Sequence, residues 1–245
     1  MSTATTTIAS TPLTARIDAL PWDDLRGQLD GRGFAVTAPV LGDEECRDLS
    51  DLFDGGRFRS TIDMARYRFG DGRYRYFDHP LPAAIGELRT SFYRHLAPLA
   101  NAWSGLLGGD GHAYPLEHEE LLAHCRAAGQ GRPTPLILRY GEGDWNALHQ
   151  DLYGDVSFPF QVLTVLSEPG VDYEGGEFVL LEQRPRAQSR AHVVPAPRGA
   201  FVVFPTHHRP QQGARGYYKV GLRHGVSTIA SGSRTALGII FHDAR

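Results

Sequence analysis

The sequence predicts a mainly β fold with helical support, an α+β arrangement in which a jelly roll carries N-terminal helices on one sheet. From Pro135 onward, short runs of strand-forming residues alternate with glycine and proline, and about eight runs at this spacing are typical of a double antiparallel sheet. The preceding segments show helical spacing of apolar residues instead. At 245 residues, with 41% hydrophobic and 22% charged residues, the chain fits one large domain.

The predicted domain divides into a helical half and a β half. Residues 1–14 are rich in serine, threonine and alanine, so we expect a disordered or loosely attached tail. Residues 15–245 are expected to form a single domain, with 15–130 as a helical and substrate-lid half and 131–245 as the jelly-roll core.

Local signals place the individual elements. Pro21 suits the first turn of a helix and Gly31 its end, and a second helix is expected to begin at Gly42. Further helices are expected over 83–107 and 116–128. The expected strands are 33–37, 135–140, 145–151, 159–167, 176–182, 191–195, 200–204, 217–228 and 234–242.

The segment His149-Gln150-Asp151 carries the clearest chemical signal. Positions i and i+2 of a strand point to one face, so His149 and Asp151 can reach the same point. A histidine from another strand, for which His224 is the candidate, completes two imidazoles and one carboxylate, a set that suits non-haem Fe(II) with open coordination positions. An isolated pair of this kind is more often a surface pair or a satisfied buried histidine, so the surrounding residues decide.

Two segments resemble Fe(II)/2-oxoglutarate-dependent dioxygenases. The run from Arg139 to Asp151 (RYGEGDWNALHQD) is similar to their first metal-binding strand, especially that of AlkB-type enzymes, in which a tyrosine placed like Tyr140 precedes the histidine by nine positions. The run from His224 to Arg234 resembles the distal histidine and arginine segment of the wider superfamily.

Residues 135–243 as a whole resemble a family of bacterial 2-oxoglutarate/Fe(II) oxygenases. The resemblance implies a double-stranded β-helix fold and the use of Fe(II), 2-oxoglutarate and O2. The distal carboxylate of 2-oxoglutarate needs a planar cation that donates two parallel hydrogen bonds, and Arg234 is the candidate. The resemblance implies that Tyr140 adds a phenolic donor to the same carboxylate.

His224 and Arg234 can face one interior only if the turn between their strands has an odd number of residues. A three-residue turn over 230–232, with Gly232 left-handed, would pair Thr228 with Arg234. Because His224 and Thr228 have the same strand parity, this turn predicts that Arg234 points to the metal side.

Two neighbouring histidines compete with His224 for the third ligand position. His207 and His208 follow a predicted strand and offer two further imidazoles. If one of them is the ligand, Arg215 or Arg223 becomes the candidate anchor for 2-oxoglutarate. The spacing to the downstream arginine favours His224.

Two segments offer cations and rings for substrate binding. Residues 57–77 interleave arginines with aromatic residues, which suits phosphate contacts with base stacking and resembles the nucleotide-recognition lid of AlkB-type enzymes. An insertion over 205–219 is the second. The candidate substrate-binding residues are Arg66, Arg68, Arg73, Arg75, Tyr76, His207, His208 and Arg209. Alternatively, the first segment is an edge strand with solvated arginines, and the second is a structural loop.

The predicted function is hydroxylation of a C–H bond by an iron- and 2-oxoglutarate-dependent dioxygenase. The favoured substrate is the methyl group of a methylated nucleobase, in oxidative demethylation or 5-methylcytosine oxidation. Single-stranded or damaged nucleic acid is the expected partner, because a base inside a duplex must be flipped out first. The alternatives are hydroxylation of a free amino acid or other small metabolite, and a non-catalytic cupin-like binding module.

Composition limits the other possibilities. The formal net charge of −3 does not by itself indicate nucleic-acid binding. No apolar run approaches a membrane span, and no secretory signal pattern is present, so no membrane association is expected. Cys46 and Cys125 form no metal or redox motif, which favours a cytoplasmic setting. No protein partner is predicted.

Overall fold

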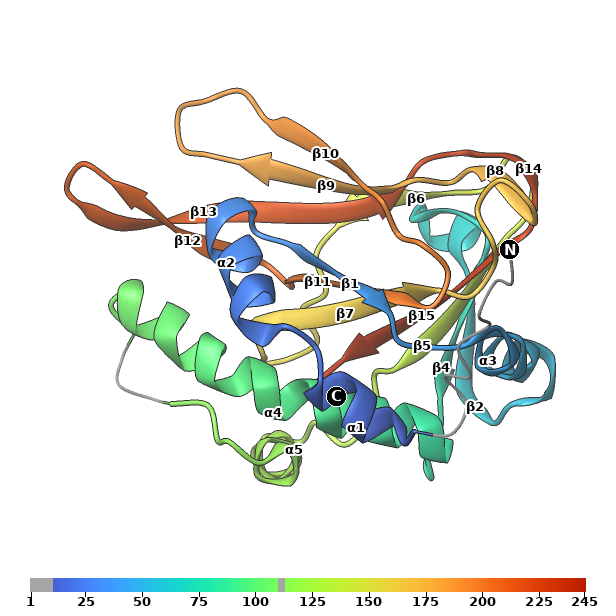
Figure 1. The fold of residues 1–245 in the computed structure, drawn as a ribbon, viewed down its shortest axis with the longest axis horizontal. Helices are drawn as coiled ribbons and strands as arrows, with labels where there is room; N and C mark the ends of the chain where they lie inside the picture. Colours follow the sequence, from blue (N-terminus) through green and yellow to red (C-terminus); the bar gives the residue numbers. More distant parts are fainter. Residues whose placement is uncertain (1–10, 110–112) are drawn as a thin grey trace, which may run out of the picture.

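Two antiparallel sheets face each other in the computed structural model, which describes residues 11–109 and 113–245 (Figure 1). The larger sheet has seven strands in the order β1-β11-β7-β15-β5-β4-β2. These strands are β1 (Ala35–Pro39), β2 (Phe58–Asp63), β4 (Arg73–Phe77), β5 (Leu136–Tyr140), β7 (Phe160–Val165), β11 (Ala200–Pro205) and β15 (Arg234–Ile240).

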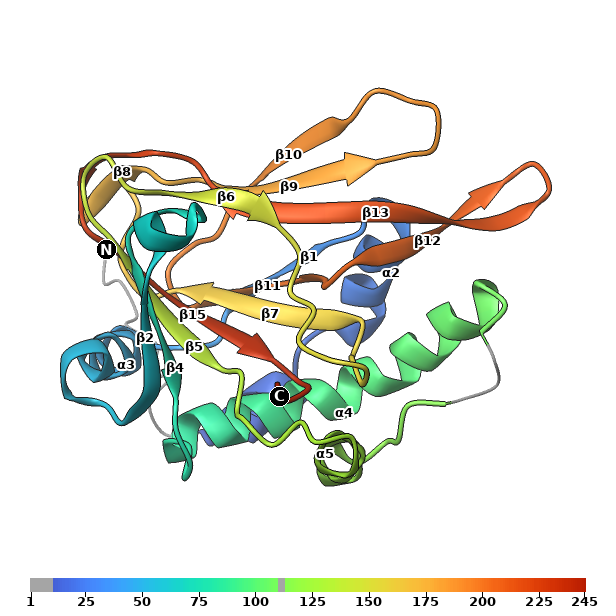
Figure 2. The ribbon, with the colours of Figure 1, turned by 180° about the vertical axis from the view of Figure 1, so that it is seen from behind.

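The second sheet has the order β10-β9-β13-β6-β3, and β12 pairs with the outer part of β13 as a long hairpin (Figure 2). Its strands are β3 (Gly70–Asp71), β6 (Trp145–His149), β9 (Phe178–Gln183), β10 (Arg190–Val194), β12 (His208–Gly213) and β13 (Gly216–Val226). A two-stranded ribbon of β8 (Tyr173–Gly175) and β14 (Ile229–Gly232) lies at one end of the two sheets. Two facing antiparallel sheets confirm the jelly-roll prediction.

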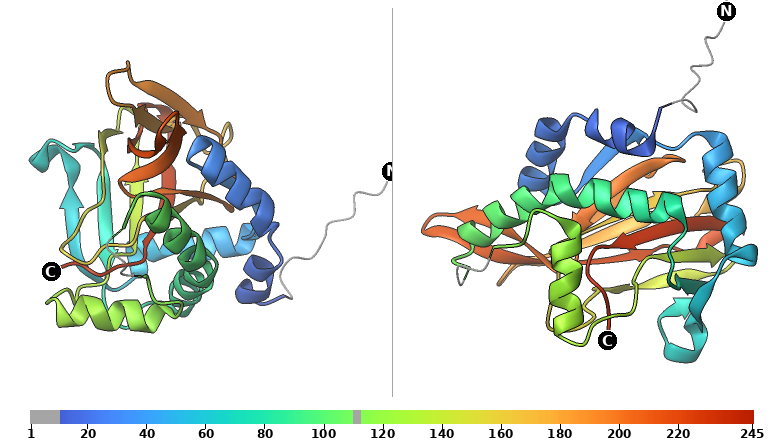
Figure 3. Two further views of the ribbon diagram at one scale, coloured as in Figure 1. Left: turned by 90° about the vertical axis from the view of Figure 1, so that its left-hand side faces the viewer. Right: turned by 90° about the horizontal axis from the view of Figure 1, so that it is seen from below.

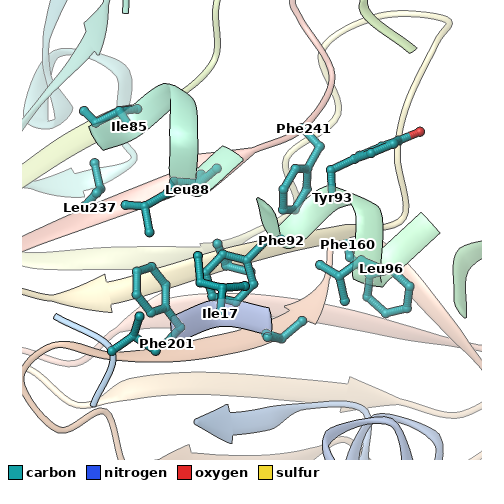
Figure 4. Packing of buried hydrophobic residues seen from close by; sticks show 14 of the residues in the cluster. Ile17, Ile85, Leu88, Phe92, Tyr93, Leu96, Phe160, Phe201, Leu237 and Phe241 are labelled. Carbon is teal, nitrogen blue, oxygen red and sulfur yellow. The ribbon is translucent and has the colours of Figure 1, made fainter. Parts of the chain in front are cut away.

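The helices pack mainly against the outer face of the seven-stranded sheet (Figure 3). The longest is α4 (Ala83–Leu106), and the others are α1 (Leu13–Asp18), α2 (Trp22–Arg32), α3 (Asp43–Gly55) and α5 (His118–Ala127). On α4, the ring centroid of Phe92 lies 4.7 Å from that of Phe201, and both rings belong to the packed cluster (Figure 4). The ring centroid of Trp103, also on α4, lies 4.5 Å from that of Phe160. Burial of these aromatic side chains joins the helical layer to β7 and β11.

A second apolar cluster fills the space between the two sheets. The whole of β7 is buried because both of its faces are covered. Val162 points into the cluster on the helix side, and the next residue, Leu163, points into the cluster between the sheets. Phe178 from β9 and Phe204 from β11 meet across the inter-sheet space with ring centroids 4.9 Å apart. The site described below opens into this inter-sheet cluster.

The predicted three-residue hairpin over 230–232 is wrong. β13 stays in the smaller sheet, β14 pairs with β8, and β15 enters the larger sheet between β7 and β5. Gly232 does adopt a positive φ of 81°, and a Cβ there would lie 2.1 Å from the carbonyl oxygen of Asp172. The close approach to β8 therefore requires this glycine, and the chain crosses between sheets instead of turning back.

Two local expectations also need correction. The insertion over 205–219 is a hairpin of β12 and β13, although its residues have little strand propensity. Residues 1–10 of the expected tail lie outside the described residues. The rest of that segment is not loose, because α1 begins at Leu13 and the backbone N–H and hydroxyl of Thr14 donate to Glu87.

The buried histidine His118 should make the folding stability depend on pH. Burial and the nearby Arg89 charge lower the pKa of His118 to about 3, although its ring contacts the Phe241 carbonyl oxygen at 2.8 Å. Because the unfolded histidine takes up a proton near pH 6.5 and the folded one does not, stability falls as the pH drops below about 6.5. Between pH 7 and pH 5 this group alone costs about 2 kcal/mol.

We expect His118→Gln to remove that contribution while keeping an amide donor for the carbonyl. Urea denaturation of both proteins at pH 7 and pH 5 measures it. The free energy of unfolding should fall by about 2 kcal/mol less in the variant than in the wild type. An identical pH dependence in the two proteins would show that His118 is not held neutral by the fold.

Among the helices that the structure describes, none is both long enough and apolar enough to cross a membrane.

Candidate metal centre

His149 and His224 lie opposite each other on neighbouring strands of the smaller sheet. β6 pairs with β13 in antiparallel register, and His224 is the Cα partner of His149. Residues opposite each other on one face of an antiparallel pair have adjacent side chains. Their ring centroids are 4.2 Å apart, so the sheet register alone brings the two imidazoles together.

Asp151 joins them from the segment just beyond β6, which ends at His149. Gln150 holds this segment in place, because its side-chain amide donates to two backbone carbonyl oxygens around β12 and β13, at 3.0 and 2.8 Å. The Asp151 Oδ2 atom lies 3.1 Å from His224 Nε2, and Oδ1 lies 3.6 Å from His149 Nε2. The strand prediction over 145–151 was therefore two residues too long, but the two side chains still converge.

The three side chains fit a divalent ion. One ligand atom from each lies within 4.8 Å of the others, the only such group among the residues of 11–109 and 113–245. Two ligands at right angles, each about 2.1 Å from an ion, are about 3.0 Å apart, which matches the distance between Asp151 Oδ2 and His224 Nε2. Two imidazoles and one carboxylate are the donor set of mononuclear Fe(II) sites with open positions.

The protonation states suit metal binding. Burial and the neighbouring His224 lower the pKa of His149, which favours the neutral imidazole that a metal requires. Burial alone would raise the pKa of Asp151, but the charge and hydrogen bond of His224, with smaller contributions from His149 and Tyr153, hold it well below its usual value. Asp151 is therefore an anion at neutral pH.

Neighbouring groups orient each candidate ligand. The Nδ1 atom of His149 lies 2.7 Å from the Ala147 carbonyl oxygen, so an Nδ1–H donor leaves the Nε2 lone pair for a metal. The ring of His224 packs against Phe204, with centroids 4.9 Å apart. The Tyr153 hydroxyl donates to Asp151 Oδ1 at 2.7 Å. Burial and the Asp151 charge raise the pKa of Tyr153 well above its usual value, so it remains a donor.

Arg234 reaches the same interior from the other sheet. It is 1% exposed, and its Nε and Nη1 atoms have no hydrogen-bond partner among the described residues. Its guanidinium carbon lies 5.7 Å and 5.9 Å from the ring centroids of Tyr140 and Tyr173. A buried cation with unused donors is costly without an anion. Arg234 points inward, as expected, but for a different reason. It lies on β15 of the larger sheet and faces His224 of the smaller sheet across the space between them, whereas the predicted hairpin would have joined the two residues within one sheet.

Tyr140 lies beside Arg234 on the neighbouring strand β5, where the two residues are register partners. It is fully buried, and its hydroxyl accepts a hydrogen bond from Asn146 Nδ2 at 3.2 Å. Burial raises the pKa of Tyr140 to about 12, so its phenol keeps its proton and can donate to an anion bound by Arg234.

Two cavities meet the metal side chains. An inner cavity of about 50 Å³ is lined by His149, Asp151 and His224 together with Arg234 and Tyr140. An outer cavity of about 200 Å³ also touches His149 and Asp151, and its further lining residues are Phe69, Tyr74, Tyr76, Leu136, Leu138, Asn146, Ala147, Gln150 and Tyr153. His149 and Asp151 thus line both the inner cavity that contains Arg234 and this aromatic outer cavity.

The insertion does not supply ligands or cleft residues. His207 and His208 contact each other and line a separate cavity of about 410 Å³. Arg209, expected to bind substrate, is 1% exposed and pairs with Glu182 at 2.8 Å. That buried ion pair joins the β12–β13 hairpin to β9, so the placement of Arg209 does not support the substrate role predicted for it.

The arginine-rich segment separates into two parts. Tyr74 and Tyr76 of β4 line the outer cavity, so strand alternation places Arg73 and Arg75 on the opposite face, where Arg75 stacks over Phe53 of α3. The substrate-binding role expected for Arg73 and Arg75 is therefore not supported by their placement. Tyr76, also expected to bind substrate, lies in the cleft.

Arg66 and Arg68 lie in or next to a 3-10 turn, Met64–Tyr67, between β2 and β3, and both are exposed. Two aromatic residues of the same turn region, Tyr67 (56% exposed) and Phe69 (47% exposed), stack with ring centroids 5.7 Å apart. Phe69 also lines the outer cavity, which places this turn at the cleft.

Sequence reasoning missed Asn146, Tyr153 and Tyr74 as neighbours of the site. Tyr153 stands two residues after Asp151 and continues the i, i+2 pattern of His149 and Asp151, so its spacing was a usable signal. Tyr74 shares strand parity with Tyr76. Asn146 gave no signal, because its contact with Tyr140 depends on the turn between β5 and β6.

A jelly roll that encloses a His-Asp-His group with a buried arginine defines the class of 2-oxoglutarate/Fe(II) oxygenases. Comparison with known families agrees. The chain belongs to the oxygenase family described as catalysing oxidative methylation of damaged DNA, whose model matches residues 72–244. As a member of this superfamily, it uses Fe(II), 2-oxoglutarate and O2.

Relatives and solved structures extend the comparison. An uncharacterised protein of Mycobacterium tuberculosis, found in strains CDC 1551 and H37Rv, is 48% identical over 184 residues, which cover 71% of this chain and 78% of that protein. The fold is similar to a 2-oxoglutarate/Fe(II) oxidoreductase from Burkholderia pseudomallei, with a TM-score of 0.55, 17% identity and coverage of 91% and 92%. It is also similar to a prolyl hydroxylase from Trichoplax adhaerens in complex with a hypoxia inducible factor peptide, with a TM-score of 0.53, 16% identity and coverage of 97% and 96%.

Proposed function

We propose that this oxygenase hydroxylates the methyl group of a methylated base in DNA or RNA, with iron held by His149, Asp151 and His224. The observation that carries the assignment is one inner cavity lined by the three candidate ligands and by the buried guanidinium of Arg234, two nitrogens of which have no hydrogen-bond partner among the described residues. An iron ion needs the three ligands, and the distal carboxylate of 2-oxoglutarate needs the guanidinium of Arg234.

The chain's own residues then have separate tasks. The two imidazoles and the Asp151 carboxylate would hold the ion and leave other coordination positions open. Arg234 donates two hydrogen bonds to the distal carboxylate of 2-oxoglutarate, and the Tyr140 hydroxyl donates a third. When bound, Fe(II) and 2-oxoglutarate supply the oxidising chemistry: one atom of O2 goes into succinate, CO2 is released, and the other atom becomes a hydroxyl on the substrate carbon.

The size and the aromatic lining of the outer cavity favour a substrate whose reacting group is a single flat ring. Its volume of about 200 Å³ is below the roughly 300–1,000 Å³ of pockets for drug-sized ligands. Phe69, Tyr74 and Tyr76 line it, and aromatic side chains stack on any unpaired base. A flipped base entering this cleft would approach His149 and Asp151, and the exposed Arg66 and Arg68 could contact the flanking phosphates. The damaged-DNA description of the family agrees with this substrate class.

The test is succinate release with single-stranded oligonucleotides that carry N-methylated bases or 5-methylcytosine, beside unmethylated oligonucleotides and free amino acids. We expect methylated strands to raise the rate at least tenfold, with formaldehyde released from N-methyl bases. Stimulation should weaken steeply as salt rises from 50 to 200 mM, since phosphate contacts release counterions. Salt-independent stimulation by an amino acid would replace this substrate with a small metabolite.

A matched pair of variants tests the turn. Arg68→Gln should raise the KM for the oligonucleotide and reduce the slope of log affinity against log salt by about 0.7, the contribution of one phosphate contact on a single strand. Arg73→Gln, in the same segment but on the far face of β4, should leave both unchanged. Equal effects of the two substitutions would exclude the turn as the phosphate-binding element.

A further inference from the structure

A hydrogen-bonded chain of two tyrosines runs from the aromatic cleft to the metal carboxylate. The Tyr76 hydroxyl donates to the Tyr153 hydroxyl at 3.0 Å, and the Tyr153 hydroxyl donates to Asp151 Oδ1 at 2.7 Å. Tyr76 lies on β4 and Tyr153 follows β6, so the chain links the two sheets at the mouth of the site. Both rings line the outer cavity and meet edge to face, with centroids 6.2 Å apart.

The two oxygens of Asp151 therefore have different surroundings. Oδ1 accepts the hydrogen bond from Tyr153, whereas Oδ2 lies 3.1 Å from His224 Nε2, the separation expected of two neighbouring ligands on one ion. A hydrogen bond to one oxygen of a ligating carboxylate fixes its orientation and weakens that oxygen as a ligand.

We propose that Tyr153, supported by Tyr76, is a positioning residue that keeps Asp151 bound to iron through Oδ2 alone. This inference rests on the proposed metal centre. With one position taken by each of three side chains, three positions of an octahedral ion stay open, two for 2-oxoglutarate and one for O2. A carboxylate free to turn could bind through both oxygens and occupy one of them.

Packing keeps Tyr76 and its hydroxyl in place. Tyr76 is 8% exposed, and the guanidinium carbon of Arg59 lies 4.3 Å from its ring centroid. Arg59 is itself held by a hydrogen bond from Nε to the Pro133 carbonyl oxygen. Because Tyr76 forms part of the cleft wall, a group that enters the cleft contacts the same chain that orients the metal carboxylate.

The test compares Tyr153→Phe, Tyr76→Phe and the wild type, with Fe(II) added anaerobically. The measurements are the Fe(II) dissociation constant and the visible charge-transfer band formed with 2-oxoglutarate. Tyr153→Phe should weaken Fe(II) binding by about 10- to 100-fold, the usual effect of losing a partner of a metal ligand, and should shift the band. Tyr76→Phe should act in the same direction by about threefold, because it removes the bond that polarises the Tyr153 hydroxyl.

Tyr93→Phe is the matched control. It also loses a hydroxyl that makes one hydrogen bond, here 2.7 Å to the Pro115 carbonyl oxygen, but this hydroxyl lies on the helical side of the protein. It should lower the melting temperature without changing the Fe(II) affinity or the band. If Tyr153→Phe does not fold, Tyr76→Phe decides alone.

Wild-type affinity and an unshifted band in the folded tyrosine variants would overturn the positioning role. Absence of the band in the wild type would instead reject the metal centre itself, so the two failures are distinguishable.

Discussion

Replacing Asp151 with alanine should abolish Fe(II) binding and turnover. The substitution removes the only anionic ligand of the group and leaves two imidazoles, whose centroids are 4.2 Å apart, to hold the ion. Loss of a mere partner of a metal ligand typically costs 10- to 100-fold in affinity, so loss of the ligand itself should cost at least about 100-fold. Succinate release should fall below detection at Fe(II) concentrations that saturate the wild type.

Asp155→Ala provides the matched control. Asp155 is an exposed carboxylate four residues further along, and it pairs with Arg245 at the surface. Its removal should leave Fe(II) binding and turnover unchanged. Equilibrium dialysis of both variants under anaerobic conditions gives the affinities, and binding by Asp151→Ala within tenfold of the wild type would show that iron lies elsewhere.

Replacing Arg234 with methionine should raise the KM for 2-oxoglutarate by about 30-fold or more. Truncating one partner of a buried, hydrogen-bonded charge pair costs about 2–5 kcal/mol, and each 1.4 kcal/mol is tenfold. Two nitrogens of this buried guanidinium have no hydrogen-bond partner in the part of the chain that the structure describes, so its replacement should not lower the free energy of unfolding and should raise it slightly.

Arg234→Lys separates charge from geometry. Lysine retains the positive charge but lacks the planar pair of donors, so its KM should fall between those of the wild type and the methionine variant. Initial rates of succinate release over a range of 2-oxoglutarate concentrations, with urea denaturation of each protein, provide both readouts. An unchanged KM in Arg234→Met, or a loss of stability with no change in KM, would assign Arg234 a purely structural role.

The proximal half of the site could be predicted from local sequence because its geometry is local. His149 and Asp151 are two residues apart, and strand alternation alone brings them to one face. The antiparallel register that places His224 opposite His149 depends on pairing over 75 positions, so only the spacing to Arg234 and the resemblance to known oxygenases indicated it.

The position of Arg234 shows where a local argument failed. The parity of a three-residue hairpin predicted an inward side chain, but β13 and β15 belong to different sheets. Both sheets direct alternate side chains into the same inter-sheet space, so the Arg234 side chain points inward even though the predicted turn is absent. The topology that decides this depends on the pairing of β14 with β8, two short strands that carry no clear sequence signal.

The roles of the charged residues in the arginine-rich segment 57–77 and in the insertion 205–219 were harder to predict. An arginine on a short strand can face solvent, a neighbouring helix or a substrate, and composition does not distinguish these environments. Arg75 stacks on Phe53, and Arg209 pairs with Glu182 in the interior. Tyr76, by contrast, lines the outer cavity beside His149 and Asp151, because one face of β4 forms part of its wall.

The most direct test of the metal centre is anomalous diffraction at the iron edge from crystals loaded with Fe(II) and 2-oxoglutarate without oxygen. We predict one iron peak about 2.0–2.2 Å from His149 Nε2, His224 Nε2 and Asp151 Oδ2, the distances at which divalent ions of this size bind such donors. The distal carboxylate of 2-oxoglutarate should lie against Arg234. An iron peak at His207 and His208, or a carboxylate bound away from Arg234, would contradict this account.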